Sequence, residues 1–166
     1  HQKEAAEQAA RTDTLTGTAT RLAFTEVAEV EMQRALRYRN DLSLLMLDLD
    51  HFKGINDEHG HVTGDAVLVH FAQVVQQQIR NMDLLARLGG EEFVVLLPNV
   101  NAEQAAVLAE RIRGAVSESR LMANGRPLRF SVSIGVAQFA WRELSLTRWM
   151  SRADAALYRA KEQGRN

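Results

Sequence analysis

Two adjacent glutamates beside a pair of glycines are the first groups in this sequence that can do chemistry. Glu91 and Glu92 follow Gly89 and Gly90 and directly precede an apolar stretch over residues 93–97. Glycine tolerates the positive backbone dihedral angles of a tight turn, so we expect the flanking segments to pair as strands with Glu91 at the tip. This geometry offers carboxylates to a metal ion or a phosphate-bearing ligand. Alone, the motif is most often a solvated turn, so its function depends on what else lies beside it.

Asp48 and Asp50 interrupt the apolar run of residues 44–50 at its carboxyl end. Alternation along a strand places both carboxylates on one face. An ionised carboxylate in such a strand costs on the order of several kcal/mol unless a cation or hydrogen bonds compensate. Two interpretations stay open: a bound metal ion, or an Asp48 that lies past the strand end and accepts hydrogen bonds from loop amides. If the hairpin lies beside this strand, Asp48 and Glu91 share one site with oxygen ligands suited to Mg²⁺.

The segment between these acids is typical of a nucleotide-binding loop. Lys53 can neutralise a phosphate, exposed loop amides can bind its oxygens, and Asn56 and Asp65 can pair with the edge of a base. Asp65 suits guanine, because a carboxylate accepts from both the ring N–H and the exocyclic amine. The alternative for Asp65 is a charge favoured in the first turn of a helix. His59 and His61 lie in a glycine-containing turn, and we interpret them as structural rather than zinc-binding.

Hydrophobic periodicity predicts the elements that must position these groups. Helices are expected over residues 22–38, 63–80, 101–119 and 146–163, and strands over residues 42–49, 83–88, 92–97 and 128–139. Asn101 and Gln104 are spaced as in a capping box. The core order β-α-β-β-α-β with flanking helices favours an α/β (α+β) fold, close to the ferredoxin-like or palm-type arrangement. Residues 1–11 are rich in helix formers and are expected to end a connecting helix, and residues 12–166 to form one domain.

Composition limits the partners. The 166 residues are 46% hydrophobic and 25% charged, which is enough for one compact domain. A net charge of −1 gives no basic field for nucleic acid or for direct contact with an anionic membrane, so a small anionic ligand fits better. The absence of cysteine excludes disulfides and thiolate metal sites and suits the cytoplasm. No stretch is long enough to cross a bilayer, and the abrupt start predicts a piece of a longer protein, which can itself be membrane-anchored.

Several segments match one known family in order and spacing. They are Asp48 to Lys53 with Asn56 and Asp57, His59 to His61 with Gly64 and Asp65, Gly89 to Phe93, and the segments 13–17, 131–136 and 153–166. In this combination they resemble the GGDEF family, whose members are bacterial diguanylate cyclases. Any one match is weak, but several across almost the whole chain make coincidence improbable.

The resemblance implies that two GTP molecules become cyclic di-GMP and two pyrophosphates, by attack of each ribose 3′-hydroxyl on the α-phosphate of the other GTP. It implies that Asp48, Glu91 and the carbonyl of Leu49 bind Mg²⁺, two ions per GTP with Mn²⁺ as a substitute, and that Glu92 assists. Lys53 joins this catalytic set by neutralising phosphate charge.

Six residues match substrate-binding positions of the family: Phe52, Lys53, Asn56, Asp65, Lys161 and Arg165. Of these, Lys53, Lys161 and Arg165 neutralise the β- and γ-phosphates, helped by backbone amides near Phe52. Asn56 and Asp65 match the guanine readers. Without the resemblance, Lys161 and Arg165 are cations that favour a helix carboxyl terminus.

The resemblance also implies assembly and regulation. Each domain holds one GTP, so two copies must meet as a homodimer across a two-fold axis, brought together by a missing amino-terminal regulatory domain. Arg80 and Asp83 resemble the family's RxxD inhibitory site for the product. Arginine can stack on guanine and pair with phosphate, and Asp83 can bind a guanine edge, so cyclic di-GMP can lock domains in an unproductive pose. On spacing alone, they are an ordinary pair of charges at a helix end.

The chain departs from the family pattern at Thr18 and Thr20, where leucine and asparagine are common, which affects the packing of that turn. Glu91 in place of aspartate keeps the charge. Two alternatives to an active cyclase stay open: a catalytically silent module that binds GTP or cyclic di-GMP, and a cyclase with adenine-containing products. Retention of the acids at Asp48, Glu91 and Glu92 favours turnover, and Asp65 disfavours adenine.

Overall fold

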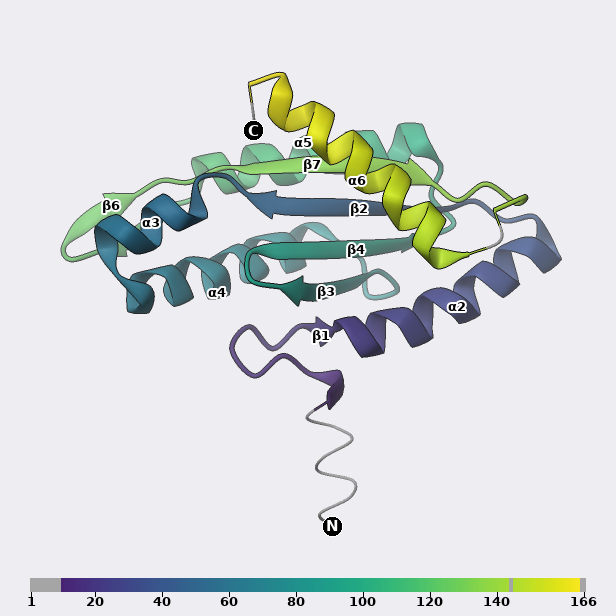
Figure 1. The fold of residues 1–166 in the computed structure, drawn as a ribbon, viewed down its shortest axis with the longest axis horizontal. Coiled ribbons are helices and arrows are strands. Elements are labelled where there is room, and N and C mark those ends of the chain that lie inside the picture. The colour runs from purple at the N-terminus through teal and green to yellow at the C-terminus, as the bar shows by residue number, and fades with distance from the viewer. Residues whose placement is uncertain (1–9, 144, 165–166) are drawn as a thin grey trace, which may run out of the picture.

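The computed structural model describes residues 10–143 and 145–164. In this part of the chain, a five-stranded sheet carries helices on both faces, with strand order β1-β3-β4-β2-β7 (Figure 1). Its strands are β1 (Ala19–Thr20), β2 (Leu42–Leu49), β3 (Leu84–Gly89), β4 (Glu92–Pro98) and β7 (Val132–Gln138). The helices are α2 (Arg21–Tyr38), α3 (Phe52–His59), α4 (His61–Gln78), α5 (Ala102–Glu118) and α6 (Leu146–Glu162). A separate two-stranded sheet pairs β5 (Leu121–Ala123) with β6 (Arg126–Leu128).

The main sheet confirms the predicted β-α-β-β-α-β core. This core consists of β2, the helix pair α3 and α4, β3, β4, α5 and β7. Strand β2 lies between β4 and β7 and pairs antiparallel with both, and β3 pairs antiparallel with β4. The short strand β1 adds an edge parallel to β3, so the sheet is mixed. The arrangement is the predicted ferredoxin-like, palm-type one with an extra edge strand and the flanking helices α2 and α6.

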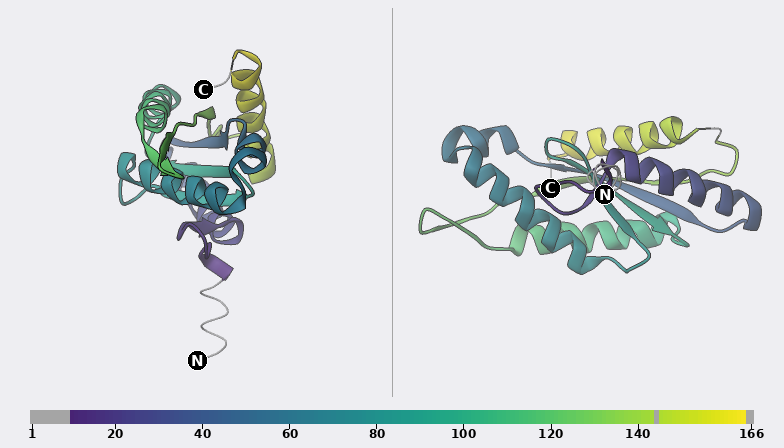
Figure 2. Two further views of the ribbon diagram at one scale, coloured as in Figure 1. Left: turned by 90° about the vertical axis from the view of Figure 1, so that its left-hand side faces the viewer. Right: turned by 90° about the horizontal axis from the view of Figure 1, so that it is seen from below.

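The central strand β2 is buried on both sides. Leu45 and Leu47 pack in a cluster with residues of α4 and α5, whereas Leu44 and Met46 pack in a cluster with residues of α2 and α6. Successive side chains of a strand point to opposite faces, so a strand covered on both faces has an unbroken apolar sequence. Figure 2 shows the two helix layers on opposite sides of the sheet. An acidic residue at the end of such a strand therefore lies at the edge of a packed core.

Local signals set several element ends as predicted. Strand β2 has the predicted bounds. The capping box is confirmed, because Asn101 Oδ1 accepts from the Gln104 amide and Gln104 Oε1 accepts from the Asn101 amide, both at 2.9 Å. Helix α4 begins at His61, two residues before the predicted start, because Gly60 alone connects α3 to α4.

Other segments differ from the prediction. The strand expected over residues 128–139 spans only Val132–Gln138, and the β5–β6 hairpin precedes it. The turn of this hairpin is Asn124-Gly125, with φ of 53° and 77°, which is a strongly favoured pair for a two-residue hairpin turn. Of the connecting helix expected over residues 1–11, only Ala10 and Arg11 are described, and both are helical, so the domain boundary stays a prediction. The described helices include none that is both long and apolar enough to span a membrane.

Candidate functional site

The β3–β4 hairpin lies directly beside β2 and brings the acidic residues together. Asp48 on β2 is the register partner of Glu92 on β4. At the tip, the Leu49 amide donates to the Glu91 carbonyl at 3.3 Å. Gly90 has a φ of 49°, a left-handed conformation that glycine adopts at no steric cost. The three residues predicted to bind metal, Asp48, Leu49 and Glu91, therefore lie at one end of one strand pair.

Asp48 is a mostly buried carboxylate with one unpaired oxygen. Its side chain is 13% exposed, and its Oδ2 lies 2.9 Å from Lys161 Nζ. Its Oδ1 is buried and has no hydrogen-bond partner among the described residues. The alternative that Asp48 lies past the strand end and accepts loop amides is wrong, because Asp48 is part of β2. A buried polar atom without a hydrogen-bond partner lowers stability by about 1–3 kcal/mol, and a charged one by more. A cation beside Oδ1 would remove that cost.

Negative charge accumulates around Glu92. Partial burial, followed by the charges of Asp48, Asp154 and Glu91, raises the pKa of Glu92. Sequence reasoning missed Asp154, which comes from α6. Its signal is spacing, because a residue that precedes Lys161 by about two helical turns lies on the same face of the helix. An excess of carboxylates at one place suits a divalent cation.

The types of ligand at this site suit a metal ion, although the side chains do not already form a complete coordination site. Among the residues described, no three histidine, aspartate or glutamate side chains are already placed to hold a metal ion. Lys161 instead neutralises Asp48. Carboxylate and carbonyl oxygens are the ligands that Mg²⁺ prefers, and the unpaired Oδ1 of Asp48 supplies one. The residues that would hold such a cation are Asp48, Glu91 and the carbonyl of Leu49.

Helix α3 changes the interpretation of the predicted nucleotide-binding loop. The sequence predicts loop amides around Phe52 and Lys53, but this is wrong, because these residues form the first turn of a helix. His51 precedes it with a φ of 56°, and no side chain caps the helix start. Uncapped amides at a helix amino terminus attract anionic oxygens. The expected donors are thus present, but a helix end positions them.

The two predicted guanine readers come from helices joined by a single residue. Asn56 is half-buried on α3, and Asp65 is exposed on α4. Gly60, with a φ of 89°, ends α3 and directly precedes α4. Its amide donates to the Asn56 carbonyl at 2.8 Å. This sharp connection places Asn56 and Asp65 on neighbouring helices.

Of the two predicted phosphate-binding cations near the carboxyl end, only Lys161 is described, and Arg165 lies outside the described residues. Lys161 lies in the last turn of α6. This helix is anchored on β7 by Trp149, which is fully buried and whose Nε1 donates to the Ala137 carbonyl at 3.0 Å. The anchored helix holds Lys161 over Asp48.

Arg87 connects the start of the domain to the β3–β4 hairpin. Its Nε donates to the Gly90 carbonyl at 2.9 Å, and its Nη1 lies 3.3 Å from Asp13 Oδ2. The same Asp13 oxygen accepts from the amide and the hydroxyl of Thr16 at 3.0 and 2.6 Å. Sequence reasoning missed Arg87, although it lies just before the glycine pair. The turn that follows the connecting segment is thereby linked to the tip that carries Glu91.

The two departures from the family pattern are accommodated in this turn. Thr20 caps α2, because its hydroxyl accepts from the Ala23 amide at 3.3 Å. Thr18 is 8% exposed, and its hydroxyl lies 2.9 Å from that of Thr16. Threonine is a good helix cap, and the buried hydroxyl has a partner. The turn is therefore held by hydroxyl hydrogen bonds.

We expect Asp13→Asn to lower stability in a pH-dependent way. Burial alone would raise the pKa of Asp13, but hydrogen bonds from Thr16 and the charge of Arg87 outweigh it and lower the pKa. A carboxylate with a lowered pKa stabilises the fold above its unfolded pKa, and this stabilisation is lost as pH falls through the folded pKa. The gap in unfolding free energy between the parent and Asp13→Asn should be full at neutral pH and shrink below about pH 4.

Urea unfolding at neutral pH and at about pH 3 measures this gap. Glu110→Gln is the matched control, because Glu110 pairs with Arg113 on the exposed face of α5. The control should change stability by less than about 0.5 kcal/mol. A gap for Asp13→Asn that is the same at both pH values would contradict the prediction.

A second predicted pair, Arg80 and Asp83, forms a closed contact where β3 begins. Arg80 Nη2 lies 2.6 Å from Asp83 Oδ1, and the Arg80 amide donates to Asp83 Oδ2 at 2.8 Å. The hydrogen bond with Asp83 raises the pKa of Arg80. The Asp83 side chain is 1% exposed, whereas that of Arg80 is 48% exposed. In this structure Arg80 pairs with the carboxylate of Asp83, which is the group predicted to bind guanine. The guanidinium group of Arg80 remains accessible to solvent.

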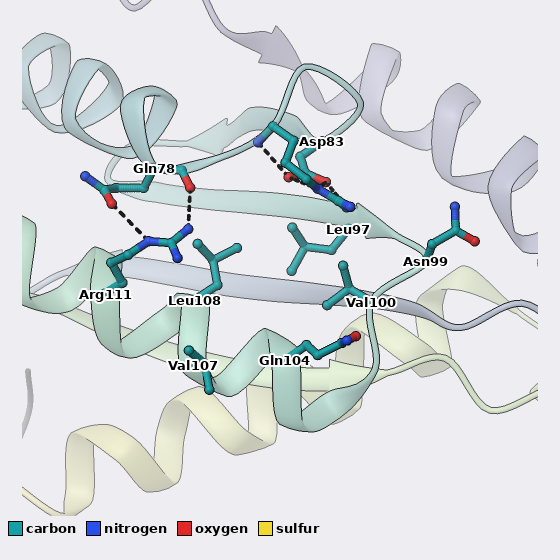
Figure 3. Close-up of a pocket in the computed structure, with 10 residues that line it drawn as sticks. Gln78, Asp83, Leu97, Asn99, Val100, Gln104, Val107, Leu108 and Arg111 are labelled. Carbon is teal, nitrogen blue, oxygen red and sulfur yellow. Dashed lines mark hydrogen bonds and ion pairs between the residues drawn. The ribbon is translucent and has the colours of Figure 1, made fainter.

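A pocket of about 250 Å³ lies beside this pair, between the end of α4, β4 and α5 (Figure 3). Arg111 on α5 lines it together with Arg80 and donates to the backbone carbonyl and Oε1 of Gln78 at 2.8 and 3.1 Å. The side chains of Val107 and Leu108 give it an apolar wall. Sequence reasoning missed Arg111, because only the packing of α5 beside α4 brings it here. The pocket combines two guanidinium groups with an apolar surface.

Comparison with known proteins gives matches over almost the whole chain. A family model described as "Diguanylate cyclase, GGDEF domain" matches residues 10–166. Diguanylate cyclase DgcP of Pseudomonas aeruginosa is 45% identical over 159 residues, which cover 96% of this chain and 24% of that protein. Diguanylate cyclase DgcM of Escherichia coli K12 is 44% identical over 164 residues, which cover 99% of this chain and 39% of that protein. The chain thus spans about a quarter to two fifths of the length of these relatives.

Solved structures agree with these matches. The GGDEF domain of DgcB from Caulobacter crescentus, in complex with c-di-GMP, has a TM-score of 0.90 and 39% identity, over 95% of this chain and 93% of that chain. The active GGEEF domain of a diguanylate cyclase from Vibrio cholerae has a TM-score of 0.76 and 36% identity, over 82% of this chain and 86% of that chain. The fold described above is thus shared with proteins that carry these names.

Proposed function

Because the chain belongs to the GGDEF domain family of diguanylate cyclases, we propose that it condenses two molecules of GTP into cyclic di-GMP and two molecules of pyrophosphate. The observation that carries the proposal is Asp48, an acid within a buried strand that has one unpaired oxygen and lies beside the Glu91 hairpin. An apolar residue would pack there at lower free energy. A carboxylate kept in this position supports a role in binding the metal that phosphoryl transfer needs.

In the proposed reaction, Asp48, Glu91 and the carbonyl of Leu49 hold Mg²⁺, two ions per GTP, and Mn²⁺ can substitute. When bound, Mg²⁺ polarises the triphosphate and favours loss of the 3′-hydroxyl proton. Glu92 assists beside them, in a position where its pKa is raised. The ammonium group of Lys161, which pairs with Asp48 in this structure, would then pair with the phosphates instead.

The remaining residues of the site bind the nucleotide. Lys53, Lys161 and Arg165 neutralise the β- and γ-phosphates, and the uncapped amides at Phe52 and Lys53 donate to phosphate oxygens. Asn56 and Asp65 on the joined helices read guanine. These roles are supported by the family membership and by the position of the helix start at the end of β2.

The proposed reaction needs two copies of the domain. Each copy holds one GTP and supplies one attacking hydroxyl, so a homodimer must form with the two sites face to face, controlled by an amino-terminal regulatory domain. A solved structure of DgcB from Caulobacter crescentus contains a coiled coil together with its GGDEF domain, with a TM-score of 0.92 and 36% identity over 99% of this chain and 87% of that chain, and this supports the use of a coiled coil to dimerise the domain. We further propose that the reaction occurs in the cytoplasm, without direct contact of this domain with membrane or nucleic acid.

The proposal is tested by incubating the domain, fused to a dimerising coiled coil, with GTP and Mg²⁺ and separating the products by chromatography and mass. Cyclic di-GMP should accumulate. The fusion removes weak dimerisation as a reason for failure. If no product forms and the domain still binds GTP or cyclic di-GMP, it is a silent binding module and the proposed catalysis is wrong.

We also propose that Arg80 and Asp83, with the adjoining pocket, bind cyclic di-GMP and inhibit turnover. Arg80→Ala should leave the initial rate within about twofold of the parent and raise the inhibitory product concentration by at least about tenfold, because a charged contact contributes about 1.5–3 kcal/mol. Initial rates are measured over a range of added cyclic di-GMP. Arg113→Ala changes a partly exposed arginine on another face of α5; it is the control and should keep the inhibition. Unchanged inhibition in Arg80→Ala at micromolar product would contradict the assignment.

A further inference from the structure

Gly64 lies where the two proposed guanine readers meet. It is a buried residue in the first turn of α4, directly before Asp65. A Cβ atom added at Gly64 would lie 1.8 Å from Asn56 Oδ1, 2.9 Å from Asn56 Cγ and 3.4 Å from Phe52 Cζ. Heavy atoms without a covalent bond do not approach to 1.8 Å, so the two groups cannot share this space. The carboxamide of Asn56 therefore occupies the place that a side chain at position 64 would fill.

The backbone at Gly64 does not itself require glycine. Gly64 is within a helix and outside the left-handed φ range, and its amide donates to the Gly60 carbonyl at 3.0 Å. Glycine in a helix is about 0.8–1.0 kcal/mol less favourable than alanine in intrinsic propensity. Neither backbone conformation nor helix propensity thus explains why glycine occupies this position. The close approach of the Asn56 side chain explains it.

The position of the Asn56 carboxamide depends on this space. Within the described part of the chain, the carboxamide has no hydrogen-bond partner to hold it, so steric fit against α4 and the Phe52 ring sets its place. A carboxamide offers both donors and an acceptor, which must be aimed at a base edge to discriminate. A methyl group at position 64 would push it away from α4 and away from the base that Asp65 contacts.

We infer that Gly64 is a positioning residue for nucleobase specificity, which seats the Asn56 carboxamide for guanine; this rests on the proposed use of GTP. The residue acts through Asn56 and touches no substrate itself. Gly64→Ala should therefore weaken guanine nucleotide binding even though alanine favours the helix. The loss should vanish when the Asn56 carboxamide is absent.

The experiment measures binding of 3′-deoxy-GTP and 3′-deoxy-ATP with Mg²⁺ by calorimetry, because these nucleotides lack the attacking hydroxyl and are not turned over. Gly64→Ala should weaken 3′-deoxy-GTP binding by about tenfold, as expected for one or two lost hydrogen bonds, and leave 3′-deoxy-ATP binding nearly unchanged. Asn56→Ala should show a similar loss, and adding Gly64→Ala to Asn56→Ala should cause no further loss. Gly114→Ala is the matched control, a helical glycine on α5 with nothing within 4 Å of an added Cβ.

The outcomes separate this inference from the proposed function. If the parent binds no 3′-deoxy-GTP, the proposed function fails. If the parent binds but Gly64→Ala equals Gly114→Ala, the inference is wrong and the proposed function stands. An equal loss caused by Gly64→Ala with and without Asn56 would show a packing role only, which also overturns it. If Gly64→Ala does not fold, the Asn56→Ala background should restore folding, and failure to do so would overturn it as well.

Discussion

Replacing Asp48 with asparagine is expected to lower the rate of cyclic di-GMP formation by at least about a thousandfold. Asparagine keeps the size of the side chain but loses the charge that pairs with Lys161 at 2.9 Å and that we propose to bind Mg²⁺. The fold should persist, because a neutral amide is less costly to bury than an ionised carboxylate. Product is quantified at saturating GTP and Mg²⁺, and thermal unfolding reports on the fold.

Asp41→Asn is the matched control for this variant. Asp41 directly precedes the other end of the same strand, where its Oδ1 accepts from Gln138 Nε2 at 3.2 Å near the surface. Its turnover should stay within about twofold of the parent. An Asp48→Asn variant that is folded and turns over like this control would exclude Asp48 from the chemistry.

Gly135→Ala is expected to destabilise the domain by about 3 kcal/mol, through overpacking against backbone that cannot yield. A Cβ at Gly135 on β7 would lie 2.3 Å from the Ala153 carbonyl oxygen, 2.4 Å from the Leu157 amide nitrogen and 2.9 Å from the Leu157 Cα, all on α6. The melting temperature should fall by about 6–12 °C for a domain of this size. Activity should fall as well, because α6 carries Lys161 to Asp48.

Gly114→Ala again serves as the control, because an added Cβ there meets open space. It should raise or maintain the melting temperature, since alanine is the better helix former. Differential scanning calorimetry of the two variants gives the comparison directly. If Gly135→Ala has the same melting temperature as the parent, α6 does not pack closely against β7 at this position.

An element of the fold could be predicted where the local sequence indicates which of its residues are buried or where it begins. The unbroken apolar run of β2 predicts a strand covered on both faces, and the Asn101 capping box predicts the start of α5. Helix α3 could not be predicted in this way, because it is only eight residues long, none of its residues is fully buried, and only Phe52 and Ile55 pack against the core. Strand β1 is only two residues long and exists through its pairing with β3.

The residues of the candidate site likewise fall into those that stand out in the sequence and those that do not. Asp48 and Glu91 stand out in sequence because a charge in an apolar strand and a pair of acids at a glycine turn both need an explanation. Asp154 is indicated only by its helical spacing from Lys161, and neither Arg87 nor Arg111 stands out in the sequence. Asp154 comes close to Glu92 only when α6 packs into place. Arg87 reaches Asp13 only when the first turn of the domain packs beside β3, and Arg111 reaches Gln78 only when α5 packs beside α4. Tertiary contacts therefore supply the part of the site that the sequence leaves open.

The most direct measurement is the time course of cyclic di-GMP and pyrophosphate released by the dimerised domain from GTP and Mg²⁺, with Asp48→Asn measured in parallel. Two pyrophosphates per cyclic di-GMP from the parent, and neither product from Asp48→Asn, is the result we predict. Pyrophosphate without cyclic di-GMP, or the same yield of cyclic di-GMP from both proteins, would contradict a diguanylate cyclase that works through Asp48.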